Sequence, residues 1–173
     1  IGRCLPKLSR RPLISTKVGR LIRPGVREGN ELYGDRQPFY LANPDKRFIF
    51  DFSYDGVLRS HEESLQRLGV DAVDILHIHD SDEHFTDAVQ GAYQALNRLR
   101  DEGSVKAVSA GMNQWEMLSK LLDHGDFDCF LLAGRYTLLD QSSLAELLPK
   151  CLKHGTSIVI GGVYNSGILA NPV

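Results

Sequence analysis

The stretch Leu13-Ile-Ser-Thr-Lys-Val-Gly19, read together with Val73-Asp-Ile-Leu-His-Ile-His-Asp80, decides the fold prediction. Each is a short apolar run that ends in a residue able to handle protons, Lys17 in the first and His79 in the second. Alternating helix and strand patterns lie between the two runs and continue after them. Because side chains at the carboxyl ends of parallel strands converge on the face where ligands bind, we expect Lys17 and His79 to share one pocket.

The composition is that of an ordinary globular domain. The chain has 173 residues, of which 42% are hydrophobic and 24% charged, enough for one domain with a core. The formal net charge of −2 gives no basic footprint, so we expect no nucleic-acid partner. No apolar run approaches the roughly 20 residues that cross a membrane, and no signal peptide is visible. The sequence therefore predicts a cytoplasmic protein without a membrane partner.

The cysteines support the same compartment. Cys4, Cys129 and Cys151 are odd in number and far apart in the sequence. Their spacing is neither that of a zinc site nor that of a disulfide framework. We interpret them as unpaired thiols in a reducing environment.

Strand-like and helix-like segments alternate along the whole chain. Apolar runs predict strands at residues 13–17, 72–78, 105–110, 127–133 and 156–160. Apolar stripes at helical spacing predict helices at residues 56–68, 85–100, 113–122 and 143–154. Apolar strands without alternation are typical of a parallel sheet that is covered by helices.

Local signals mark the ends of these helices. Asn113 and Ser143 each precede a glutamate by three residues, the spacing of a capping box. Gly69 and Gly155 stand where helices are expected to end. Residues 20–55, after the first strand, are expected to form a long loop. Within this loop, the aromatic patch Arg47-Phe-Ile-Phe-Asp-Phe-Ser-Tyr54 indicates a short hairpin or a docked segment.

Two architectures fit this order of elements, a doubly wound open sheet and part of a (β/α)8 TIM barrel. No G-x-G-x-x-G motif follows a strand, which counts against a dinucleotide-binding Rossmann unit. A metal site is also weighed at the end of the second strand, where His77, His79, Asp80, Asp82 and His84 are close in sequence. Their spacing matches no familiar metal site, so we predict no metal.

Several motifs, taken together, resemble those of the aldo-keto reductases. The matching stretches are Ile14-Ser-Thr-Lys-Val-Gly19 for the third strand, Asp74-Ile-Leu-His-Ile-His79 for the fourth, Leu99-Arg-Asp-Glu-Gly-Ser-Val-Lys-Ala-Val-Ser-Ala-Gly111 for the fifth and Gly161-Gly-Val-Tyr-Asn-Ser-Gly-Ile-Leu169 for the seventh. The last of these, with Phe130-Leu-Leu-Ala-Gly-Arg-Tyr-Thr-Leu-Leu139, resembles one branch. That branch holds sugar 1-dehydrogenases of the L-fucose and D-threo-aldose type and pyridoxal dehydrogenases.

This resemblance implies a fold, a reaction and a set of site residues. It implies a (β/α)8 TIM barrel of which residues 1–173, as a single incomplete domain, cover about strands 3 to 7. It implies hydride transfer between NAD or NADP and a sugar or another aldehyde or alcohol. Lys17 takes the family's lysine position and His79 its histidine position. Asn113 matches an Asn that holds the nicotinamide carboxamide, and Met112 stands at the preceding cofactor position, where Ser is common.

The family's catalytic set also contains an Asp and a Tyr, which the resemblance places before Ile1. We therefore expect this stretch alone to have no measurable dehydrogenase activity. In the complete site, the ammonium of Lys17 would lower the pKa of the Tyr, and His79 would hydrogen-bond the substrate oxygen. Of the two histidines in the strand, we expect His79 to face the pocket and His77 to point outward, toward the helices.

Other functions remain open from the residues. The chain could be a non-catalytic binding or assembly subunit built on the barrel, or a truncated and inactive fragment. It could also belong to an aldolase or hydrolase barrel in which Lys17 forms a Schiff base. Borohydride trapping of Lys17 with a carbonyl compound would favour the aldolase. The sequence indicates no oligomeric state.

Overall fold

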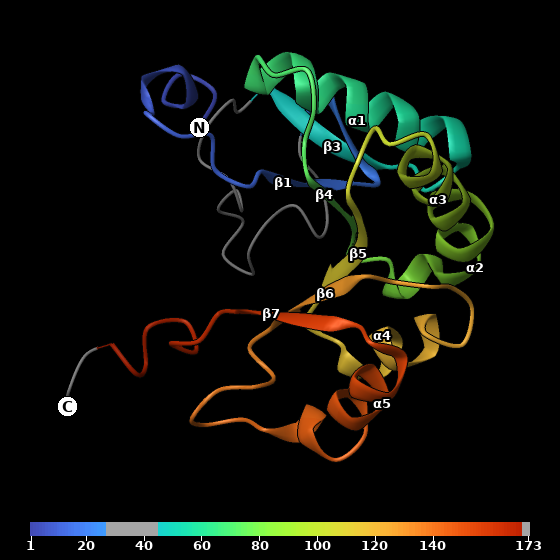
Figure 1. The fold of residues 1–173 in the computed structure, drawn as a ribbon, viewed down its shortest axis with the longest axis vertical. Helices are drawn as coiled ribbons and strands as arrows, with labels where there is room; N and C mark the ends of the chain where they lie inside the picture. Colours follow the sequence, from blue (N-terminus) through green and yellow to red (C-terminus); the bar gives the residue numbers. More distant parts are fainter. Residues whose placement is uncertain (27–44, 171–173) are drawn as a thin grey trace.

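Five parallel strands form one curved sheet, and the helices cover one of its faces (Figure 1). The computed structural model describes residues 1–26 and 45–170. The strands neighbour one another in chain order, as predicted, and every pairing is parallel. In this order the strands are β1 (Ser15–Val18), β4 (Ile75–His79), β5 (Ala107–Met112), β6 (Cys129–Ala133) and β7 (Ser157–Gly161). Because the order has no switch point, the sheet is part of a (β/α)8 barrel rather than a doubly wound sheet.

Helical segments make the crossovers between the strands. They are α1 (Tyr54–Leu68), α2 (Phe85–Asp87), a π-helical turn η4 (Ala88–Ala92), α3 (Tyr93–Asp101), α4 (Trp115–Leu121) and α5 (Leu147–His154), with short 3₁₀ turns at η1 (Leu5–Lys7), η3 (Asp82–His84) and η5 (Ser142–Leu144). As predicted, Gly69 and Gly155 end α1 and α5 in the left-handed conformation, with φ of 65° and 74°.

Both predicted capping boxes are wrong. The side chain of Asn113 does not cap α4, because its Nδ2 donates to the carbonyl of Ala133 at 2.9 Å. The hydroxyl of Ser143 lies in η5 and donates to the carbonyl of Arg135 at 2.8 Å, so α5 begins only at Leu147. In each case the side chain that the local spacing assigned to a cap instead contacts a more distant carbonyl, at the last residue of β6 for Asn113 and in the loop after β6 for Ser143.

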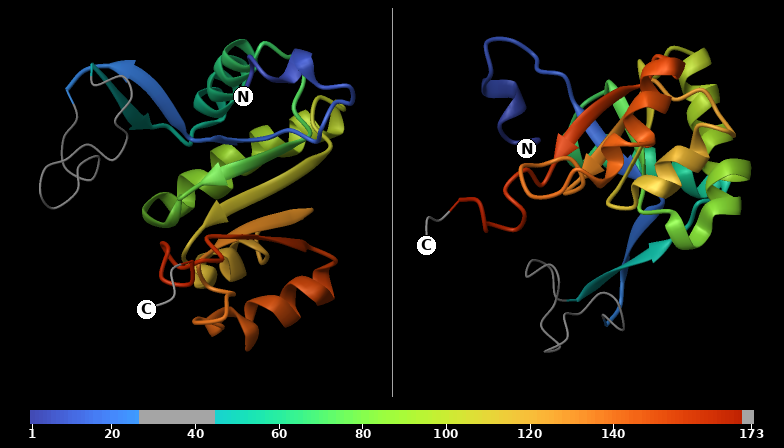
Figure 2. Two further views of the ribbon diagram at one scale, coloured as in Figure 1. Left: turned by 90° about the vertical axis from the view of Figure 1, so that its left-hand side faces the viewer. Right: turned by 90° about the horizontal axis from the view of Figure 1, so that it is seen from below.

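The sheet has one covered face and one uncovered face. Alternate strand residues are buried against the helices, among them Val18, Leu76, Ile78, Val108, Ala110, Phe130 and Leu132. The intervening residues point to the other side, which is the interior of a closed barrel. Among these, Ser15, Lys17 and Ser157 are exposed, and the helices α1 to α5 lie on the opposite side (Figure 2).

An antiparallel hairpin projects from the sheet at the carboxyl end of β1 (Figure 2, left). It consists of β2 (Arg20–Pro24) and β3 (Lys46–Phe50), and it belongs to the segment 20–55 that was expected to hold a short hairpin or a docked loop. Residues 27–44 of that segment lie outside the described residues. The chain enters the hairpin through Gly19 at φ 98°, where a Cβ would clash with the ring of Phe52. The hairpin carries the aromatic patch to the carboxyl end of the sheet.

Candidate functional site

The candidate site lies at the carboxyl ends of the strands, beside the hairpin. An open cavity of about 410 Å³ there is lined by Lys17, Arg20, Phe48, Phe50, His79, Asp80, Gly111, Met112, Asn113, Leu131 and Ala133. The four residues that the sequence nominated, Lys17, His79, Met112 and Asn113, all border it. The prediction that Lys17 and His79 share one pocket is therefore confirmed, and they come from neighbouring parallel strands.

Both histidines of β4 face the barrel interior. The prediction that His77 points toward the helices is wrong, because residues two apart in a strand share a face. His77 pairs in register with Lys17 and borders a second cavity with it on the uncovered face. It is 3% exposed, and its Nδ1 lies 2.7 Å from the Oγ of Ser109. His77 thus lies one layer deeper in the barrel than His79.

Both imidazoles are neutral at physiological pH. Burial, together with the nearby cations Arg20 and Lys17, lowers the pKa of His79 to about 3. Burial likewise lowers the pKa of His77 to about 4, with a contribution from Lys17. A neutral imidazole can still donate one N–H. His79 can therefore offer a hydrogen bond to a substrate oxygen without being protonated.

Asp80 directly follows His79 and touches it. The Nε2 of His79 lies 3.2 Å from the Oδ2 of Asp80, and because the imidazole is neutral this contact is not an ion pair between two charged groups. The backbone of Asp80 is left-handed, with φ of 44°, and its N–H donates to the carbonyl of Gly111 at 3.0 Å. Burial raises the pKa of Asp80, while the charge of Arg20 acts against this rise.

Arg20 joins the hairpin to Asp80. Its Nη2 donates to the Oδ2 of Asp80 at 2.5 Å. Its guanidinium lies over the rings of Phe48 and Phe50, 4.9 Å and 5.2 Å from their centroids. The sequence analysis did not place Arg20 or these aromatic residues at the site. Their positions in the sequence could have identified Arg20 and Asp80 as site residues. Each follows, within two residues, the end of a strand that carries a nominated residue.

The end of β5 forms the side of the cavity where the sequence predicted cofactor-binding residues. Asn113 is exposed; one N–H of its amide donates to the carbonyl of Ala133, and its Oδ1 has no partner among the described residues. An amide offers both a donor and an acceptor, which is what a nicotinamide carboxamide requires. Gly111 and Ala133 beside it are small and leave room for a flat ring. These residues fit a nicotinamide, whereas the side chain of Met112 is packed in the core.

The acidic and histidine-rich segment after β4 does not gather into a metal site. Within residues 1–26 and 45–170, no three His, Cys, Asp or Glu side chains are placed to hold a metal ion. His84 instead packs its ring against Phe50 and Phe52, with centroids 5.1 Å and 5.3 Å apart. Across the same described ranges, no helix is long and apolar enough to cross a membrane.

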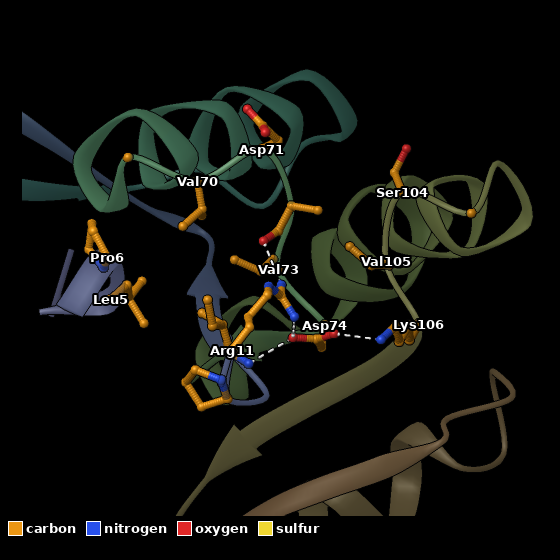
Figure 3. A pocket seen from close by; sticks show the side chains of 15 residues that line it. Leu5, Pro6, Arg11, Val70, Asp71, Val73, Asp74, Ser104, Val105 and Lys106 are labelled. Carbon is orange, nitrogen blue, oxygen red and sulfur yellow. Dashed lines mark hydrogen bonds and ion pairs between the residues drawn. The ribbon is translucent and has the colours of Figure 1, made fainter. Parts of the chain in front are cut away.

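A separate cavity lies at the amino ends of the strands (Figure 3). At its centre the buried carboxylate of Asp74 accepts hydrogen bonds from the Ile14 N–H and from Arg11, both at 2.8 Å. Its other oxygen lies 2.9 Å from the Nζ of Lys106. The hydrogen bond from Ile14 and then the contact with Lys106 lower the pKa of Asp74 to about 2. Because conserved function in barrels of this type sits at the other end, we interpret this cluster as structural.

Comparison with known proteins identifies the family. The model of the aldo/keto reductase family matches residues 1–172. The chain is 42% identical, over 191 aligned positions, to pyridoxal 4-dehydrogenase from Microbacterium luteolum, covering 99% of this chain and 54% of that protein. It is 39% identical to D-threo-aldose 1-dehydrogenase from a Pseudomonas species, and the match covers 91% of this chain and 48% of that protein. The chain thus spans about half the length of these relatives.

Solved structures agree on the fold. An aldo-keto reductase from Bacillus halodurans superposes with a TM-score of 0.72 at 18% identity, covering 99% of this chain and 50% of that one. A glycerol dehydrogenase from Gluconobacter oxydans superposes with a TM-score of 0.70 at 19% identity, covering 97% of this chain and 45% of that one. The family match extends over nearly all of the sequence, and the two similar dehydrogenases agree with the branch that the motifs indicated. The chain therefore belongs to the aldo/keto reductase family.

Proposed function

We propose that the protein that contains this chain is an NAD(P)-dependent dehydrogenase acting on a sugar or a related aldehyde or alcohol. Aldo/keto reductases are NAD(P)-dependent oxidoreductases, and the two relatives described above are named as dehydrogenases of pyridoxal and of an aldose. The observation that carries the proposal is the shared cavity of Lys17 and His79 at the ends of neighbouring parallel strands.

Each nominated residue has a distinct part in this proposal. NAD(P), when bound, supplies the hydride acceptor or donor. Asn113 holds the carboxamide of the nicotinamide through its amide. His79 donates a hydrogen bond to the substrate oxygen and stabilises the negative charge that develops there. Because its pKa is about 3, His79 keeps this donor role without gaining a charge at physiological pH.

Lys17 acts through its positive charge. The chain matches about half the length of its relatives, and we propose that the rest of the barrel supplies the family's Tyr and Asp. The ammonium of Lys17 favours the deprotonated form of a neighbouring Tyr, because an opposite charge lowers the pKa of a phenol. That Tyr then exchanges a proton with the substrate oxygen while the hydride moves at carbon.

A direct spectrophotometric assay of the full-length protein tests this proposal. The full-length protein is incubated with NAD⁺ or NADP⁺ and either L-fucose, another aldose of the D-threo type or pyridoxal, and reduced cofactor is followed by absorbance. We expect formation of NADH or NADPH with at least one of these substrates, and none from residues 1–173 expressed alone. A full-length protein that neither turns over these substrates nor binds either cofactor would contradict the proposal and favour a non-catalytic subunit.

A trapping experiment separates the dehydrogenase from an aldolase. The protein is mixed with the carbonyl form of its best substrate, reduced with borohydride and analysed by mass spectrometry of peptides. We expect no adduct on Lys17, because a charge-stabilising lysine forms no Schiff base. An adduct on Lys17 at near-stoichiometric yield would show the other chemistry.

A further inference from the structure

Arg20 and Asp80 form a partly buried ion pair in the wall of the candidate site, and the roles proposed above do not use it. The side chain of Arg20 is 19% exposed and that of Asp80 33%. Both residues border the cavity with Lys17 and His79. The pair joins two elements 60 positions apart in the sequence, the hairpin and the loop after β4.

The pair retains unused hydrogen-bonding capacity. Asp80 uses Oδ2 for the contacts with both Arg20 and His79, and its Oδ1 has no partner among the described residues. Arg20 uses Nη2, and its buried Nε has no partner in the same part of the structure. A guanidinium has five N–H donors; Nε is too buried to meet a ligand, so the two on Nη1 and the second on Nη2 remain. The wall therefore offers free donors and a free acceptor side by side.

The guanidinium is also held rigidly. It lies over Phe48 and Phe50, at 4.9 Å and 5.2 Å from the ring centroids. Its Nη2 is also hydrogen-bonded to Asp80. Donors that are already oriented lose little freedom when a ligand binds. Such a wall is suited to select a ligand by its polar groups.

We propose that Arg20 and Asp80 determine substrate specificity by binding a hydroxyl group on the carbon next to the reacting carbonyl. This inference rests on the proposed function. A hydroxyl is both a donor and an acceptor, so it can donate to the carboxylate of Asp80 and accept from Arg20. Hydrogen bonds to charged groups of this kind are shorter and stronger than neutral ones.

The position of Asp80 relative to His79 sets which hydroxyl is bound. The Oδ2 of Asp80 lies 3.2 Å from the Nε2 of His79, the atom that would hold the carbonyl oxygen. In a 2-hydroxyaldehyde the two oxygens lie about 3 Å apart, close to the length of a hydrogen bond. A carbonyl oxygen on His79 therefore brings the neighbouring hydroxyl within reach of the pair. An alkyl aldehyde in the same place leaves the Oδ1 of Asp80 and the remaining N–H groups of Arg20 without a partner, and a site that hydrogen-bonds a hydroxyl discriminates against an analogue that lacks it.

The experiment compares 2-hydroxypropanal with propanal, two aldehydes that differ by one hydroxyl. The full-length protein reduces each with NADH or NADPH, and kcat/KM is measured for both. We expect the unmodified protein to prefer 2-hydroxypropanal by at least about 10-fold. The variants Arg20→Met and Asp80→Asn should bring this ratio close to one by lowering kcat/KM for 2-hydroxypropanal only. Met keeps an apolar stem against the rings, and Asn tolerates the left-handed backbone at position 80.

The control is Arg23→Met, which removes another ion pair of the hairpin, the 3.0 Å contact with Glu63, outside the cavity. It should keep the preference of the unmodified protein. The ratio for the unmodified protein tests the inference even where a variant does not fold. Turnover of both aldehydes with a ratio near one overturns the inference and leaves the proposed function intact. An equal loss for both aldehydes in the variants also overturns it, since the pair would then only support the hairpin or His79. No turnover of either aldehyde by a protein that oxidises an aldose or pyridoxal overturns the inference alone, whereas no turnover of any of these compounds, together with no binding of either cofactor, overturns both proposals.

Discussion

The two ends of β4 carry aspartates of opposite character, Asp74 just before the strand region and Asp80 just after it. Asp74 uses both oxygens, accepting from Ile14 and Arg11 and contacting Lys106, and its pKa falls to about 2. Asp80 uses one oxygen, and burial raises its pKa. A fully satisfied carboxylate stabilises the fold, whereas a partly satisfied one beside a cavity retains capacity for a ligand.

The positively charged side chains at the two ends of the sheet differ in the same way as the two aspartates. At the amino ends, Arg11 and Lys106 both contact Asp74, and the cluster is complete without a ligand (Figure 3). At the carboxyl ends, Lys17 lowers the pKa values of both histidines of β4. The two clusters lie at opposite ends of the same strands, β1 and β4. The comparison therefore supports the proposal that one end of the sheet contributes stability and the other carries the chemistry.

The largest expected effect is at the carboxyl end. His79→Ala in the full-length protein should lower kcat/KM by about 10²–10³-fold, because it removes a preorganised hydrogen-bond donor to the substrate oxygen. Steady-state kinetics with the best substrate measure this loss. His154→Ala, at an exposed position in the last turn of α5, is the matched control and should retain full activity. Equal activity of the two variants would place the reaction elsewhere.

The next effect is at the amino end and concerns stability. Asp74→Ala should lower the free energy of unfolding by about 1–3 kcal/mol, because it leaves the buried N–H of Ile14 without an acceptor. Urea unfolding followed by circular dichroism measures the change. The folded variant should keep the kcat/KM of the unmodified protein. A variant of normal stability and impaired kcat/KM would reverse the roles assigned to the two ends.

A smaller effect is expected for the cofactor. Asn113→Ala should raise the KM for NAD⁺ or NADP⁺ by about 10-fold, the loss of one or two hydrogen bonds, with a lesser change in kcat. Gln114→Ala changes the neighbouring amide, which caps no helix through its side chain, and should leave this KM unaffected. If both substitutions have the same effect on KM, Asn113 has no specific cofactor role.

The smallest effect is a pH dependence at the amino end. The folded-state pKa of Asp74 is lowered from 3.8 to about 2, so its stabilising contribution is complete above pH 3.8 and is lost as the pH falls through about 2. The difference in urea midpoint between the unmodified protein and Asp74→Asn should therefore shrink as the pH falls from 5 toward 2. Other acidic groups and the histidines titrate in both proteins and cancel in this difference. A constant difference across the range would contradict the pKa assigned to Asp74.

The sheet could be predicted from the sequence because each strand is specified by a short run of neighbouring residues. Apolar runs at regular distances specify buried parallel strands, and the residues that follow strands specify what meets at the carboxyl end. This is how Lys17 and His79 were placed in one cavity, whereas Asn113, which also borders it, was assigned by the resemblance to the family. The outward orientation predicted for His77 was wrong because it misapplied the two-residue period of a strand.

The rest of the site depends on contacts between distant segments. Arg20 meets Asp80 across 60 positions, and Phe48 and Phe50 reach Arg20 only because the hairpin folds back beside β4. The capping prediction at Asn113 failed for a similar reason, since the carbonyl of Ala133 lies 20 positions away. No spacing rule along the chain reports such pairings.

The most direct test of the proposal that chemistry lies at the carboxyl end of the sheet replaces one lysine at each end, Lys17 and Lys106, by methionine. Lys17 and Lys106 are both exposed, at opposite ends of the sheet. Lys17→Met in the full-length protein should lower kcat by about 10²-fold or more, because the proton-transferring group loses its supporting charge, while the urea midpoint stays unchanged. Lys106→Met should leave kcat at the level of the unmodified protein. A Lys17→Met variant with the kcat of the unmodified protein, or an equal loss of kcat in both variants, would contradict the assignment of chemistry to the carboxyl end.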